Sequence, residues 1–132
     1  YFAGYKAAGQ LTVSGPNAYE KAQLTADIIW KRLANAVAKF EDTSTEYLGL
    51  SSCHGKINPI PEQLNEIVLR LGVRDMDKDK VNRFGKEIAP VITNGPPGIT
   101  GFSGGRPKAQ EIMAYWPALI PKELVQTTVD VI

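Results

Sequence analysis

The sequence has very few of the side chains that build disulfides and metal sites, with one cysteine and one histidine, Cys53 and His54, in 132 residues. A single cysteine excludes an internal disulfide and agrees with a reducing compartment, so we expect a cytoplasmic protein. One cysteine and one histidine do not make a metal site unless carboxylates come in from elsewhere. We therefore predict no metal and no cofactor.

The sequence also lacks an excess of charge and a long apolar run. Fifteen basic and fourteen acidic side chains give a net charge of +1. Such a balance creates no overall attraction to nucleic acid or to an anionic membrane surface. No apolar stretch approaches the roughly 20 residues that a helix needs to span a bilayer. These absences argue against nucleic-acid and membrane partners.

The apolar content, 43% of the residues, is enough for one domain with one core, which we place over residues 1–132. The chain opens on "YFAGYKAAG", without Met and without a signal-peptide pattern, and stops in the strand-like "VQTTVDVI". We expect a fragment of a longer chain, with the remainder of that chain or further subunits as partners.

Hydrophobic periodicity gives the order strand, helix, strand, strand, helix, strand. The predicted ranges are 5–15, 16–40, 43–52, 65–75, 77–92 and 109–121. The strand over 65–75 is the clearest, because apolar side chains alternate from Ile67 to Val73 with charged ones. Asp75 or Asp77 is the expected cap of the second helix, and the run "RDMDKDK" is interpreted as a solvated helix start. Pro90 should kink or end that helix, and Pro117 confines the last strand to an edge or bends it.

This order is typical of an α+β fold, the ferredoxin-like β-α-β-β-α-β two-layer sandwich, in which two helices cover one face of a four-stranded antiparallel sheet. A three-layer parallel sheet is the alternative. Its strands would be apolar on both faces, whereas "IVLRLGVR" carries arginines on one face. We predict the antiparallel fold.

The most unusual segment is "TNGPPGITGFSGGRPK", residues 93–108, with five glycines and three prolines. A phosphate cradle of the usual kind lies at a helix N-terminus, but this loop follows a helix C-terminus and lacks a Gly-Lys-Ser/Thr ending. Two interpretations remain, a nest of backbone donors that binds an anion with the help of two cations, and a surface connection whose glycines serve turns. The candidate ligand-binding residues are Thr93, Asn94, Gly95, Gly98, Gly104, Gly105, Arg106 and Lys108.

Catalytic candidates are few. "GFSGG" matches the nucleophile pattern G-x-S-x-G around Ser103, with His54 as the base, but that motif belongs at a strand-to-helix turn. Cys53 and His54 are adjacent in sequence, which is a poor arrangement for a catalytic pair. The competing interpretation is a cysteine packed in the core beside a solvated histidine.

Three segments carry a resemblance to a known family, "GYKAAGQLTVSGPNAYEKAQLTADIIWKRL", "NEIVLRLGVRD" and "APVITNGPPGITGFSGGRPKAQEIMAYWPALIPKELV". They resemble the second half of the large domain of the acyclic terpene utilisation family, AtuA. The likeness covers nearly the whole chain and is specific in the "VSGP" turn, the "TNGPPG" loop and the "WPALIP" strand. It implies a place in the catabolism of acyclic terpenes through acyl-CoA thioesters, and it assigns no catalytic residue.

Three classes of function stay open. The first is a domain of a terpenoid-catabolism protein that forms part of an acyl-CoA-type pocket. The second is a small binding, regulatory or oligomerisation module without catalysis, and the third is a hydrolase that uses Ser103 or Cys53. Because an uncovered apolar surface needs a partner, we also expect a homo-oligomer, or a longer chain, in which Trp116 and Leu119 touch another chain or segment.

Overall fold

The computed structural model describes residues 1–37, 39–50, 52–55, 57, 59–101 and 105–130. Its elements are β1 (Phe2–Ser14), α1 (Ala18–Ala36), β2 (Asp42–Leu48), β3 (Glu66–Asp75), α2 (Lys78–Asn94), β4 (Ile99–Thr100), β5 (Gln110–Met113) and the short 3-10 helix η1 (Lys122–Leu124). None of these helices is long and apolar enough to cross a membrane, in the part of the chain described.

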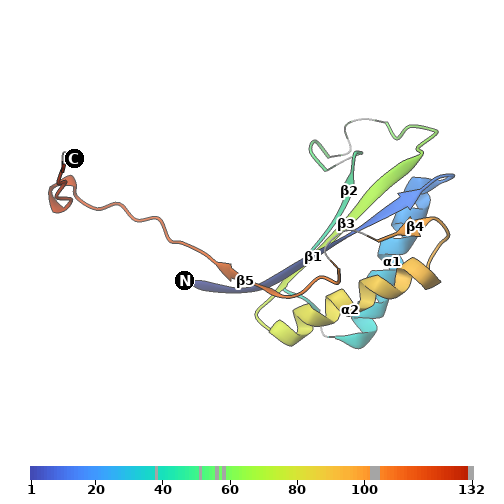
Figure 1. The fold of residues 1–132 in the computed structure, drawn as a ribbon, viewed down its shortest axis with the longest axis horizontal. Helices are drawn as coiled ribbons and strands as arrows, with labels where there is room; N and C mark the ends of the chain where they lie inside the picture. Colours follow the sequence, from blue (N-terminus) through green and yellow to red (C-terminus); the bar gives the residue numbers. More distant parts are fainter. Residues whose placement is uncertain (38, 51, 56, 58, 102–104, 131–132) are drawn as a thin grey trace.

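The elements form two layers, a sheet and a pair of helices that cover one of its faces (Figure 1). The strands lie in the order β2-β3-β1-β4, with β5 also paired to β1, and every pairing is antiparallel. The α+β class, the two helices on one face and the antiparallel sheet are therefore confirmed.

Strand periodicity explains the core between the layers. In β3, Ile67, Leu69, Leu71 and Val73 are all buried, and the register places Leu69 beside Leu11 of β1. Successive side chains of a strand point to opposite faces, so one face of the sheet is apolar and meets the helices. The helices contribute their own apolar stripes to this core, Ala22, Ala26, Ile29 and Leu33 from α1 and Val81, Phe84, Ile88 and Val91 from α2.

The helix ends follow local capping chemistry. The Asp77 carboxylate accepts hydrogen bonds from the backbone N–H groups of Asp79 and Lys80, at 2.9 and 3.2 Å, which fixes the start of α2. Pro90 does not end the helix, which continues to Asn94. Proline lacks the N–H that would bond to the carbonyl four residues earlier, that of Lys86. Because Lys86 is exposed to solvent, the helix tolerates Pro90. Helix α1 is shorter than predicted.

The structure differs from the predicted fold at the edge of the sheet opposite β2. The expected strand over 109–121 is formed only by β5, and the short strand β4 makes a second, separate pairing with β1. The sheet therefore has five strands and departs from the usual ferredoxin-like arrangement with one continuous fourth strand. Ala114 donates its backbone N–H to the carbonyl of Tyr1, and the structure describes no strand in residues 115–121.

Candidate functional site

The first part of the glycine-rich loop is tied to the turn between β1 and α1. The backbone N–H and the hydroxyl of Ser14 both donate to the carbonyl of Gly98, at 2.8 and 3.1 Å. The Lys21 ammonium donates to the carbonyl of Pro97 at 3.1 Å. The "VSGP" turn and the "TNGPPG" loop, far apart in the sequence, are therefore one structural unit.

Gly98 is required by this unit. Its φ is +84°, which side chains rarely adopt, and a Cβ there would lie 2.5 Å from the Ser14 hydroxyl and 3.2 Å from the Lys21 ammonium. Gly95 ends α2, with its N–H donating to the carbonyl of Val91 at 2.9 Å. These glycines have packing roles, and their predicted part in ligand binding stays a prediction.

The other predicted loop residues lie near the end of α2 and in the second half of the loop. Thr93 and Asn94 are exposed in the last turn of α2, and the Thr93 hydroxyl donates to the carbonyl of Pro90 at 3.2 Å. Gly105 is exposed, with φ of +75° and no atom within 4 Å of the position that a Cβ would take. Ser103 and Gly104 lie outside the described residues, so the nucleophile prediction at Ser103 is not tested.

The end of the loop is anchored at Pro107. A Cβ on Gly85, in the middle of α2, would lie 1.9 Å from the Pro107 carbonyl oxygen, and one on Gly9 of β1 would lie 3.0 Å from the Pro107 ring. Two residues further on, the N–H of Ala109 donates to the Asn82 side-chain oxygen at 2.9 Å. Pro107 is therefore packed against two glycines, with its carbonyl close to Gly85 and its ring close to Gly9.

Two cations flank this anchor. Arg106 and Lys108 are both exposed, and neither forms an ion pair with a residue that the structure describes. Beside Arg106 lies a niche of about 170 Å³ with almost wholly apolar walls. Its lining residues are Ile88, Ala89, Ile92, Gly101, Gly105, Arg106 and Pro107. The arrangement places free positive charge at the rim of a small apolar hollow.

Cys53 and His54 do not belong to this arrangement. Both are exposed, in the connection from β2 to β3, and β2 is at the opposite edge of the sheet from β4 and β5. The expectation of a cysteine packed in the core is therefore wrong. It failed because the strand ends at Leu48 and the chain turns into solvent before residue 53 is reached.

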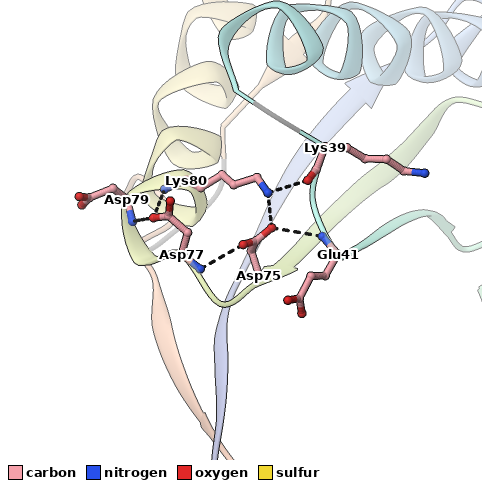
Figure 2. Close-up of polar contacts among 6 residues, drawn as sticks. All are labelled: Lys39, Glu41, Asp75, Asp77, Asp79 and Lys80. Atoms are coloured by element: carbon pink, nitrogen blue, oxygen red, sulfur yellow. Dashed lines mark hydrogen bonds and ion pairs between the residues drawn. The ribbon is translucent and has the colours of Figure 1, made fainter.

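The charge run at the start of α2 is also less solvated than predicted. Figure 2 shows the Asp75 carboxylate accepting from the backbone N–H groups of Asp77 and Glu41, at 3.0 and 3.2 Å, and from the Lys80 ammonium. Lys80 also donates to the carbonyl of Lys39 at 2.6 Å. The hydrogen bond from Lys80 holds the pKa of the buried Asp75 carboxyl below its ordinary value, against the opposing effect of burial.

This cluster has a structural role. Both oxygens of Asp75 are occupied by internal donors, and they join the β3–α2 turn to the segment between α1 and β2. Of the described residues, no group of three or more His, Cys, Asp or Glu side chains is placed to hold a metal ion.

A second buried carboxylate joins the two helices. Glu87 of α2 accepts from the Nε group of Arg32 in α1 at 2.8 Å and from Arg83 at 2.6 Å. The two arginines are about half exposed, and Glu87 is buried. Sequence reasoning missed this ion cluster. It also missed Gly85, whose only signal in the sequence is a glycine inside a helical pattern, which costs about 1 kcal/mol relative to alanine.

The fold and these contacts define an α+β two-layer domain with a glycine-rich connection anchored to both its helices. The comparisons with known proteins then place it in a family. A family model described as "Acyclic terpene utilisation family protein AtuA" matches residues 1–131, so the chain belongs to the AtuA family. Neither a curated protein nor a solved structure matches the sequence significantly.

Proposed function

We propose that this domain binds an acyl-CoA-type thioester of acyclic terpene catabolism at the surface formed by Arg106, Lys108 and the adjacent niche. The observation that carries the proposal is the pair of exposed cations on both sides of an anchored proline, of which Arg106 lines a small apolar hollow. Membership of the AtuA family supports the choice of substrate class. We propose no reaction, and Cys53, His54 and Ser103 keep no assigned role.

Two parts of such a ligand, the phosphates and the acyl chain, have matching groups in this surface. CoA carries phosphates, and a planar guanidinium binds a phosphate with two parallel hydrogen bonds, whereas an ammonium acts as a point charge. The niche, about 170 Å³, is close in size to a cavity that holds a benzene-sized apolar group. A short branched acyl chain fits that description.

Because Pro107 is held by α2 and β1, the two cations are presented from a fixed backbone. A preorganised site loses less conformational entropy on binding than a mobile loop would. The first half of the loop is held as well, because its Gly98 and Pro97 carbonyls accept hydrogen bonds from Ser14 and from Lys21 of α1.

The test is calorimetric titration of CoA and of isovaleryl-CoA into the parent and its variants. The double variant Arg106→Ala, Lys108→Ala should weaken both ligands, by roughly tenfold to a hundredfold for each charge-assisted hydrogen bond removed. Arg106→Lys should also weaken both, because it keeps the charge but cannot form the bidentate geometry.

Two further variants separate the parts of the site. Ala89→Leu fills the niche and should weaken isovaleryl-CoA while leaving CoA unchanged. Lys31→Ala removes an exposed cation from α1 and serves as the matched control, with unchanged affinities. Equal affinity of the parent and the double variant for both ligands would leave the loop as a connection between strands.

A further inference from the structure

A second apolar hollow lies beside β2, at the edge of the sheet opposite β4 and β5. It has a volume of about 490 Å³ and opens between the C-terminal half of α1 and the start of β2. Its apolar lining residues are Trp30, Leu33, Ala34, Val37 and Phe40. The niche beside Arg106 is lined by α2 and the glycine-rich loop, so the hollow is a separate site that the proposed function does not use.

The two aromatic walls of the hollow are held in place by other contacts. Trp30 stacks on Phe84 of α2, with 6.3 Å between the ring centroids, and its indole N–H donates to the Thr45 hydroxyl of β2 at 2.8 Å. Phe40 is buried, and the Lys80 ammonium lies 5.4 Å from the centre of its ring. A site whose walls are already fixed loses little conformational entropy when a ligand binds.

Two backbone groups of the lining residues are also paired already. Figure 2 shows the carbonyl of Lys39 accepting from the Lys80 ammonium, at 2.6 Å, and the N–H of Glu41 donating to the Asp75 carboxylate, at 3.2 Å. The indole ring apart, the polar lining residues are exposed and are Lys39, Glu41 and Thr43. The hollow therefore fits a ligand with an apolar body and one polar end that stays near solvent.

We propose that this hollow binds a flexible, acyclic apolar molecule of about ten carbons that ends in one hydroxyl group. A cavity of about 150 Å³ holds benzene, so about 490 Å³ has room for a ten-carbon chain although the hollow is open to solvent. Lys39 and Glu41 bring one charge of each sign, which favours an uncharged hydroxyl over a carboxylate. Alcohols of this kind occur among acyclic terpenes, the compounds for which the family is named.

The test uses Trp30 as a fluorescent reporter. Because the chain has two tryptophans and Trp116 is 81% exposed, the variant Trp116→Phe leaves Trp30 alone without disturbing the core. The probe is geraniol, a ten-carbon acyclic terpene alcohol, titrated below its solubility limit. It should displace water from the half-buried indole, so the Trp30 emission should move to shorter wavelength and saturate, with a dissociation constant on the order of 100 µM.

Ligand size gives a second measurement. The alcohol 3-methyl-2-buten-1-ol has the same hydroxyl end and half the carbons of geraniol. It should bind at least about tenfold more weakly, because each buried CH₂ group raises the affinity about fourfold. Equal affinity for the two alcohols would show that the apolar chain is not held in the hollow, and overturns the proposal.

Two matched variants locate the site. Ala34→Phe fills the hollow and should weaken geraniol at least about tenfold. Ala36→Phe makes the same change two residues along α1, outside the lining, and should bind geraniol like the parent. Both alanines are exposed, so both variants should keep the circular dichroism of the parent. Binding of geraniol here does not depend on CoA or on Arg106, so either site can fail its test without the other.

Three further results overturn the proposal. The first is an emission shift that grows with geraniol without saturating, and the second is equal affinity of Ala34→Phe and the parent. The third is Trp30 emission that moves with protein concentration alone, because another copy of the chain then covers the hollow.

Discussion

Replacing Gly85 by alanine tests the packing that holds the candidate site. Alanine is a better helix former than glycine, so the change should by itself stabilise α2 by about 1 kcal/mol. Against this, the new Cβ would lie 1.9 Å from the carbonyl oxygen of Pro107, which would have to retreat by about 1 Å or more. The clash is with backbone, which cannot rotate away as the end of a side chain can.

The magnitude follows from what the retreat disrupts. Overpacking of a well-packed region costs about 1–3 kcal/mol, and breaking the Ala109 to Asn82 hydrogen bond costs about 1 kcal/mol more. After the gain in helix propensity, we expect the free energy of unfolding of Gly85→Ala to fall by about 2 kcal/mol. For a domain of this size that lowers the urea midpoint by roughly 1 M.

The assay is urea unfolding followed by circular dichroism, with Lys86→Ala as the control. Lys86 is the exposed neighbour in the same helix, and its replacement should change the stability by less than about 0.5 kcal/mol. Because the retreat also moves Arg106, Gly85→Ala should bind CoA more weakly than the parent. A Gly85→Ala protein as stable as the parent, or more so, would refute the close packing of Pro107 on α2.

Two further predictions concern the buried carboxylates. Asp75→Asn leaves the largely buried Lys80 without its counterion and should cost about 3 kcal/mol, whereas Asp42→Asn, in an exposed pair, should cost less than about 1 kcal/mol. The pKa of Asp75 is lower in the folded protein than in the unfolded chain. The stability that the Asp75 carboxylate contributes is therefore complete above its unfolded pKa and is lost as the pH falls through its folded pKa. Urea midpoints of the parent and of Asp75→Asn, measured between pH 7 and pH 2, should converge at the acid end. Glu87→Gln should cost about 1–2 kcal/mol in the same assay, because its half-exposed arginine partners regain water; an unchanged midpoint would deny the ion cluster a role in joining the helices.

The main elements could be predicted because their signals are local. Alternation from Ile67 to Val73 identifies one buried face of a strand, and the Asp77 cap identifies the start of α2. Neither depends on knowing where the rest of the chain lies. The antiparallel sheet followed from the same pattern, since polar residues on alternate positions exclude helices on both faces.

What failed depends on contacts between distant segments. The edge opposite β2 is divided between β4, which pairs with Thr12 and Val13, and β5, which pairs with β1 between Phe2 and Lys6, and the sequences of β4 and β5 do not by themselves encode this division. Asp75 looked like one of several surface acids, and only its position opposite Lys80 and Glu41 makes it buried.

The candidate site also combines residues that the sequence predicted with contacts that it did not predict. Arg106 and Lys108 could be singled out from the sequence as cations in a glycine-rich loop, and the structure describes both as exposed. The packing of Pro107, which anchors these two cations, could not be predicted from the sequence. It depends on contacts in space between Pro107, Gly85 of α2 and Gly9 of β1. The tie between Gly98 and Ser14, which gives the first half of the loop its structural role, is likewise a contact between segments far apart in sequence.

The most direct test of ligand binding by the second half of the loop is a titration of CoA into ¹⁵N-labelled protein, followed by amide chemical shifts. The proposed site predicts that the largest changes fall on Arg106 and Lys108, with smaller ones on the niche residues Ala89 and Ile92, while Ser14 and Gly98 stay in place. Saturating CoA that leaves the amides of Arg106 and Lys108 unmoved, or that acts mainly on the turn between β1 and α1, would contradict it.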